Sequence, residues 1–166
     1  MIDLAAVSQC HAKQINEWSC ALCKKHPNLQ NLTHIEDVPA SIVGFVAYDR
    51  DANQILLAWR GTADLRNWVE DFNFETVEYS ACKGCVIHSG FYESYRSVSR
   101  KVNEAVDKLI AAYPSCTIAS TGHSLGGALA AVCGLEMFKN YGQRMKEIHN
   151  FGAPRIGNAA LAHYVH

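Results

Sequence analysis

Two stretches in the first third of the chain carry the pattern of β-strands. Residues 41–48 (SIVGFVAY) and 54–60 (QILLAWR) are rich in β-branched, aromatic and other apolar side chains. Residues 49–53 between them are rich in Asp and Asn. Two such runs joined by a short polar turn predict a β-hairpin. Gly61 and Thr62 interrupt the pattern directly afterwards.

From about residue 90 onward, helical patterns alternate with strand patterns. Apolar side chains recur at helical spacing through residues 90–113, and Pro114 ends this run. A buried strand, a small-residue helix, a further strand and the opening turns of a helix follow at residues 116–121, 125–140, 147–152 and 159–166. Such alternation, with right-handed crossovers, predicts an α/β fold with a mostly parallel sheet, which the N-terminal hairpin makes mixed.

The remaining segments complete one predicted domain over residues 1–166. Residues 2–18 have a helical pattern, whereas residues 24–36 are polar, contain a proline and are expected to form a loop. Residues 73–79 and 85–88 are expected to be short extended segments. No repeat, low-complexity tract or linker divides the chain, and its length allows a hydrophobic core.

Composition and charge narrow the functional classes. The formal net charge is -1 and no run of Lys or Arg forms a basic patch, so nothing favours nucleic acid binding. No stretch reaches the roughly eighteen apolar residues of a transmembrane helix. The N-terminus lacks the pattern of a signal peptide, so either the protein stays in the cell or the signal lies outside these residues. One sequon, Asn31-Leu32-Thr33, would suit a secreted protein, although the number of asparagines makes a chance match expected.

The seven cysteines include two close pairs, Cys20/Cys23 and Cys82/Cys85. Such pairs form short disulfides, redox sites or zinc sites. A zinc site requires the two pairs to meet across a long separation. A redox pair is expected between a strand and a helix, whereas the second pair lies in a predicted loop. The spacing alone leaves all three interpretations open.

The pattern Gly-x-Ser-x-Gly, in which a serine is exposed on a sharp turn between a strand and a helix, occurs at residues 122–126. Ser124 is expected to adopt a strained backbone conformation there. Gly122 and Gly126 are expected because the neighbouring helix and strand pass too close for a side chain. The free N–H of Leu125 at the helix N-terminus would bind an anionic oxygen. A plain glycine-rich packing turn does not explain a serine between the glycines.

A second donor for that oxyanion hole is expected in the loop after an earlier strand. Thr62, which follows Trp59-Arg60-Gly61, is the best candidate because it has both an N–H and a hydroxyl. Loss of one such donor typically lowers the rate by roughly a hundredfold to a thousandfold. A plain turn with a capping threonine is the alternative.

The segment directly after Thr62 is short and amphipathic. In residues 64–71 (DLRNWVED), Leu65, Trp68 and Val69 share one face. A structural helix that packs this face inward is the default interpretation. A mobile lid, whose apolar face is hidden until it meets lipid, is the more specific one.

Together with these motifs, the sequence resembles the fungal-type class 3 lipases over nearly the whole chain. The segments that carry the resemblance are residues 58–62 (AWRGT), 66–72 (RNWVEDF), Cys82-x-x-Cys85, 88–91 (HSGF), Ser94-Tyr95, 121–130 (TGHSLGGALA) and 151–158 (FGAPRIGN). Several motifs in the right order are far more specific than one serine motif alone.

The resemblance implies an α/β-hydrolase fold and a secreted enzyme that hydrolyses lipid carboxylic esters, such as triacylglycerols, without metal or cofactor. It implies an acyl-enzyme on Ser124, an oxyanion hole of Thr62 and Leu125, and a lid around Trp68 that contacts the lipid interface transiently. It also implies disulfides Cys20–Cys23 and Cys82–Cys85. Cys10 resembles a cysteine that pairs near the C-terminus of such relatives and has no such partner here, and Cys116 and Cys133 are expected to be buried free thiols.

The rest of a catalytic triad does not follow from the sequence. Hydrolases of this fold place Ser, Asp and His in that order, yet no aspartate follows Ser124. The carboxylates and imidazoles after it are Glu136, Glu147, His149, His163 and His166. In class 3 lipases the aspartate and histidine lie beyond the Gly-Ala-Pro-Arg segment. We therefore expect a truncated or incomplete lipase that lacks its general base and has almost no esterase activity.

Other functions remain compatible with the same residues. Feruloyl esterase or phospholipase activity on the same scaffold is the nearest alternative, and the apolar face of residues 64–71 argues mildly against the former. A second alternative is that the chain is a non-catalytic remnant that binds lipid or a partner. A zinc-binding module built on the two cysteine pairs ranks last.

Overall fold

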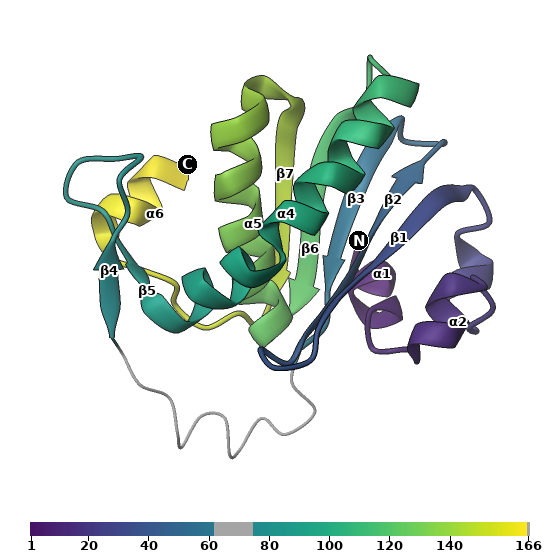
Figure 1. The fold of residues 1–166 in the computed structure, drawn as a ribbon, viewed down its shortest axis with the longest axis horizontal. Coiled ribbons are helices and arrows are strands. Elements are labelled where there is room, and N and C mark those ends of the chain that lie inside the picture. The colour runs from purple at the N-terminus through teal and green to yellow at the C-terminus, as the bar shows by residue number, and fades with distance from the viewer. Residues whose placement is uncertain (62–74, 166) are drawn as a thin grey trace.

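The computed structural model describes residues 1–61 and 75–165. Within them the main sheet has five strands in the order β1-β2-β3-β6-β7 (Figure 1). The strands are β1 (Leu29–Asp37), β2 (Ile42–Asp49), β3 (Gln54–Trp59), β6 (Thr117–His123) and β7 (Met145–Phe151). β1, β2 and β3 pair antiparallel, whereas β3, β6 and β7 pair parallel. The predicted hairpin and the predicted mixed sheet are both confirmed.

Side chains of the central strands alternate between two apolar layers. Leu57 and Trp59 of β3 belong to the core on one face of the sheet, and Leu56 and Ala58 belong to the core on the other. All four are buried. A strand covered on both faces has a continuous apolar sequence rather than an alternating one, which explains the unbroken run in β3.

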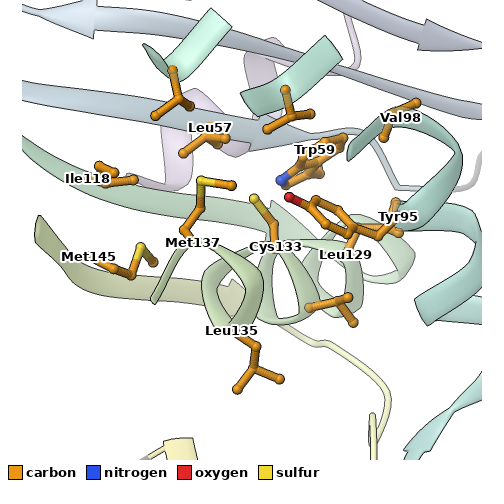
Figure 2. Packing of buried hydrophobic residues seen from close by; sticks show 14 of the residues in the cluster. Leu57, Trp59, Tyr95, Val98, Ile118, Leu129, Cys133, Leu135, Met137 and Met145 are labelled. Carbon is orange, nitrogen blue, oxygen red and sulfur yellow. The ribbon is translucent and has the colours of Figure 1, made fainter. Parts of the chain in front are cut away.

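Helices cover both faces of this sheet. α4 (Ser89–Ala112) and α5 (Leu125–Tyr141) pack on one face, and α1 (Ile2–Val7) and α2 (Ala12–Asn16) on the other (Figure 1). In Figure 2, Leu57, Trp59 and Ile118 of the sheet face Leu129, Cys133 and Met137 of α5. Each large apolar side chain buried there contributes roughly 1.5–3 kcal/mol. No described helix combines the length and apolarity that crossing a membrane requires.

A second, two-stranded sheet lies beside this core. β4 (Thr76–Glu78) pairs antiparallel with β5 (Val86–His88), and α6 (Ala159–Val165) packs against β5 (Figure 1). These short extended segments lie within the predicted ranges. The 3-10 helices η1 (Cys23–Lys25) and η2 (Gly142–Arg144) complete the described elements.

Two disulfides, Cys20–Cys23 and Cys82–Cys85, are present, which confirms the pairing that the family resemblance implies. Because the sulfurs of each pair bond to each other, the pairs supply no thiolates for zinc. The other cysteines are free: Cys116 and Cys133 are buried, as predicted, and Cys10 is partly exposed.

The loop predicted for residues 24–36 is wrong, because β1 begins at Leu29. β1 pairs with β2 alone among the described strands, and only one of its nine residues is buried. A register irregularity between Gln30 and Thr33 further breaks its alternation. An exposed edge strand of this kind lacks the apolar pattern by which strands are predicted.

The single helix predicted for residues 2–18 is also wrong, since the chain forms α1 and α2 with a break between them. The Ser8 hydroxyl donates a hydrogen bond of 2.6 Å to the Ala5 carbonyl at the end of α1. Gln14 accepts a bond of 3.4 Å from the His11 N–H at the start of α2. Such local side-chain bonds compete with a continuous helix.

Candidate active site

Ser124 occupies the junction between β6 and α5. Its backbone has φ 57° and ψ −124°, a combination that L residues rarely adopt. Its N–H donates to the Phe151 carbonyl at 2.9 Å, and its carbonyl accepts from the N–H groups of Gly127 and Ala128 at 2.9 and 3.2 Å. A backbone in such a region costs about 1–3 kcal/mol and persists because these bonds hold it. The sharp, strained turn predicted from the motif is therefore present.

The two glycines of the motif lie where any side chain would collide with the backbone. A Cβ at Gly122 would overlap the Gly126 carbonyl, and a Cβ at Gly126 would overlap the Trp59 carbonyl. The start of α5 thus lies directly against the ends of β6 and β3. The predicted requirement for residues without a side chain is confirmed at both positions.

The N-terminus of α5 presents backbone N–H groups beside Ser124. Leu125 is the first residue of this 17-residue helix. The N–H groups of a first helical turn have no acceptor within the helix, and the helix dipole makes this end positive. The Gly127 and Ala128 N–H groups donate to the Ser124 carbonyl, and Leu125 lies one residue after the serine.

The exposed serine expected from the motif is not observed, because Ser124 is buried, with 5% of the residue exposed. Its hydroxyl makes no hydrogen bond to any of residues 1–61 and 75–165. In the part of the chain that the structure describes, no imidazole is therefore bonded to Ser124.

The carboxylates and histidines downstream of Ser124 lie elsewhere. His149 Nε2 is 2.8 Å from Glu147 Oε2, and both residues are on the surface of β7, where His149 pairs with Thr121. Glu136 Oε2 lies 3.7 Å from Lys139 Nζ on α5. His163 lies exposed on α6. His166 is outside the described residues.

Two other predicted parts of the site, Thr62 and the lid segment around Trp68, also fall outside the described residues. The chain that leads to Thr62 is described as far as Gly61. A Cβ at Gly61 would lie 2.5 Å from the His123 carbonyl oxygen. The loop after β3 therefore begins in contact with the residue that precedes Ser124.

A family profile described as "Lipase (class 3)" matches residues 56–166, which include the Ser124 turn. The chain belongs to the class 3 lipase family. It is 31% identical over 154 residues to a lipase of Rhizopus niveus, covering 90% of this chain and 39% of that protein. It is 32% identical over 122 residues to secreted mono- and diacylglycerol lipase A of Penicillium camembertii, covering 74% of this chain and 40% of that protein. This class 3 lipase chain thus spans about two fifths of the length of these relatives.

Solved structures share the fold of this class 3 lipase chain. Lipase II of Rhizopus niveus superposes with a TM-score of 0.90 at 29% identity, covering 99% of this chain and 64% of that one. A triacylglycerol lipase whose catalytic centre is described as a serine protease triad superposes with a TM-score of 0.85 at 30% identity. The match covers 98% of this chain and 63% of that one. The predicted α/β-hydrolase fold is confirmed by this likeness and by the mixed sheet.

Asn158, the last residue of the motif at 151–158 and one for which the sequence predicted no role of its own, connects two parts of the class 3 lipase chain. Asn158 Oδ1 accepts the N–H groups of Leu161 and Val86 at 3.0 and 3.3 Å, and its Nδ2 donates to the Gly84 carbonyl at 2.8 Å. Asn158 therefore caps α6 and fastens the disulfide-closed loop to it. Its position directly before a run of helix-forming residues is the sequence signal for such a cap.

In the core between the sheet and the helices α4 and α5, the class 3 lipase chain buries the free thiol of Cys133. Figure 2 shows the Trp59 nitrogen and the Tyr95 hydroxyl oxygen directed toward the Cys133 sulfur. Burial raises the pKa of Cys133 from its ordinary value of 9.0 to about 12, although the neighbouring Ser120, Trp59 and Tyr95 partly oppose this. The thiol is therefore neutral at physiological pH and is a core residue rather than a nucleophile.

Proposed function

We propose that this domain, residues 1–166, supplies the nucleophile and oxyanion-binding part of a serine hydrolase that acts on lipid carboxylic esters such as triacylglycerols. The backbone of Ser124 carries this proposal: it is held at φ 57° between two glycines that admit no side chain, at the start of α5. The structural alternative, a turn that only allows close packing, accounts for the glycines but leaves the strained serine unexplained. Membership of the class 3 lipase family supports an ester substrate.

The proposed reaction proceeds through an acyl-enzyme. Ser124 Oγ attacks the carbonyl carbon of the ester as a general base takes the hydroxyl proton. The carbonyl oxygen becomes an anion, which the Leu125 N–H and Thr62 stabilise. Collapse of this intermediate breaks the bond to the alcohol, which leaves with a proton, and water then releases the fatty acid from Ser124. No metal or cofactor enters these steps.

Among residues 1–61 and 75–165, no side chain is hydrogen-bonded to the Ser124 hydroxyl, so none of them is placed as its general base. Removal of the base from a serine hydrolase leaves only the rate enhancement of the oxyanion hole and substrate binding, roughly 10³–10⁴-fold over water. We therefore propose that the 166-residue chain alone hydrolyses esters very slowly although its nucleophile is correctly placed.

The lid and the cellular location belong to the same proposal. The apolar face of Leu65, Trp68 and Val69 supports a lid that contacts a lipid surface transiently. The two disulfides support an oxidising, extracellular destination, because disulfides persist there and are rare in the cytosol. A relative in Penicillium camembertii is itself named a secreted lipase.

A fluorophosphonate probe with added imidazole tests the proposed nucleophile. Imidazole supplies a base in solution, so the probe is expected to form an adduct on Ser124 at a rate that rises with imidazole concentration. Ser124→Ala is the control and is expected to give no adduct, and Ser120→Ala, in a buried strand position, is expected to label like the parent. Intact mass and peptide mapping locate the adduct. If folded protein forms no adduct on Ser124 at any imidazole concentration, Ser124 is not a functional nucleophile and the proposal is wrong.

A further inference from the structure

The edge strand β1 contains an exposed irregularity at Asn31. The pairing of β1 with β2 shifts between Gln30 and Thr33, and Asn31 has φ 52° there. Asn31 and Thr33 are both exposed. β1 lies at the outer side of the main sheet (Figure 1), and no other described strand pairs with its free edge. Space is therefore open around the Asn31 side chain.

Residues 31–33, Asn-Leu-Thr, form the only N-glycosylation sequon in the sequence. The positive φ explains an asparagine at position 31, since asparagine tolerates this region better than most residues. The local fold does not explain the hydroxyl at position 33. Strand propensity favours a β-branched residue there, which valine would satisfy equally. Among the described residues the Thr33 side chain has no hydrogen-bond partner.

The contacts of Asn31 are compatible with a modified amide. Asn31 Nδ2 donates to the Tyr113 hydroxyl at 2.8 Å. The Tyr113 ring stacks on Tyr48 with centroids 3.6 Å apart and planes 6° apart, so its position is well defined. A primary amide has two N–H bonds, and replacement of one leaves the other available as a donor.

The disulfides indicate the compartment in which the chain folds. Cys20–Cys23 and Cys82–Cys85 are both formed, and such bonds are made in the oxidising lumen of the secretory pathway. The same lumen contains the machinery that glycosylates Asn-x-Ser/Thr sequons.

We propose that Asn31 carries an N-linked glycan, a modification that goes beyond the proposed ester hydrolysis and does not depend on it. The donor is an oligosaccharide linked to a lipid diphosphate. A bond forms between Asn31 Nδ2 and C1 of the first sugar, the bond between C1 and the diphosphate oxygen breaks, and Nδ2 loses one proton. The lipid diphosphate leaves with the electron pair, so nothing is oxidised or reduced.

A glycan at this place would also protect the sheet. The free edge of β1 presents unpaired backbone groups, which are a template for association with another strand. A bulky hydrophilic group attached beside that edge excludes such a partner. The glycan is therefore expected to reduce association of the folded chain.

The experiment expresses all 166 residues behind a cleavable secretion signal in the presence of endoplasmic reticulum microsomes. The parent chain and Thr33→Ser, which keeps the sequon, are expected to migrate with the added mass of one glycan. Thr33→Val, which keeps the β-branched shape but removes the hydroxyl, is expected to lose the added mass completely. Treatment with peptide N-glycosidase in heavy-oxygen water is expected to convert Asn31 to a labelled aspartate.

A matched control shows that the chain is accessible to the transferase. Thr33→Val combined with Glu78→Asn creates a sequon with Ser80 on the exposed strand β4. If this double variant gains a glycan and the parent chain gains none, the proposal is overturned. If parent and Thr33→Val carry the same added mass, the glycan lies elsewhere and the proposal is equally wrong.

Discussion

The carbonyl oxygen of Trp59 occupies the space that a side chain at Gly126 would need. Trp59 is the last residue of β3, and Gly126 is the second residue of α5. This contact brings the loop after β3 beside the start of the helix that follows Ser124. Two segments more than sixty residues apart in the sequence are thereby held in direct contact.

Gly126→Ala is expected to destabilise the protein by about 1–3 kcal/mol, because the new methyl group overlaps backbone that has little freedom to move. Urea unfolding followed by circular dichroism measures the effect. Gly90→Ala is the control, since its Cβ would meet only the His88 ring, at 3.1 Å. Equal stability of the Gly126→Ala variant and the parent would show that the close contact is absent in solution.

Ser124→Gly is expected to stabilise the fold by about 1 kcal/mol, because glycine adopts φ 57° without the penalty that a serine pays. Ser124→Ala retains a Cβ and is expected to show no comparable gain. Thermal and urea unfolding of the three proteins provide the comparison. A Ser124→Gly variant less stable than Ser124→Ala would contradict backbone strain at this position.

Burial of Cys133 predicts a loss of stability at alkaline pH. Its folded pKa of about 12 exceeds the ordinary value of 9.0, so the unfolded chain loses this proton first and binds fewer protons than the native chain. The contribution of the Cys133 thiol to the free energy of unfolding is fully present below pH 9. It decreases as the pH rises from about 9 toward 12, by at most about 1.4 kcal/mol per pH unit. Cys133→Ser, which has no thiol, is expected to show a shallower slope.

Urea unfolding of parent and Cys133→Ser between pH 8 and 10.5 measures these slopes. The buried Cys116, whose pKa is also raised by burial, contributes to both proteins equally, so the difference reports Cys133. Identical slopes in the two proteins would mean that Cys133 is accessible to water in the native state.

Asn158→Ala is expected to cost about 1–2 kcal/mol, because it removes the cap of α6 and leaves the Val86 N–H and the Gly84 carbonyl without their partner. Asn158→Asp keeps the oxygen acceptor but cannot donate to Gly84, so an intermediate loss is expected. Amide hydrogen exchange of residues 84–86 gives the local readout. Unchanged exchange in Asn158→Ala would rule out this residue as the connection between loop and helix.

The sequence by itself determined the elements whose signals are local. The β2–β3 hairpin follows from two apolar runs around a polar turn, and α4 from helical spacing that ends at Pro114. The Ser124 turn follows from its motif, and the steric contact that excludes a side chain at Gly122 comes from Gly126, only four residues away. The disulfide pairs followed only from resemblance to relatives, because their spacing also suits zinc and redox sites.

Tertiary structure decided what depends on distant neighbours. β1 has a polar sequence and forms a strand because its backbone pairs with β2. The sequence of residues 24–36 has no periodicity that predicts this pairing. Asn158 holds the loop at Gly84 across more than seventy residues. The space closed to a side chain at Gly126 belongs to Trp59, on another strand. Hydrogen bonding and steric exclusion act through space, so residues far apart in the chain acquire these roles only when folding brings them together.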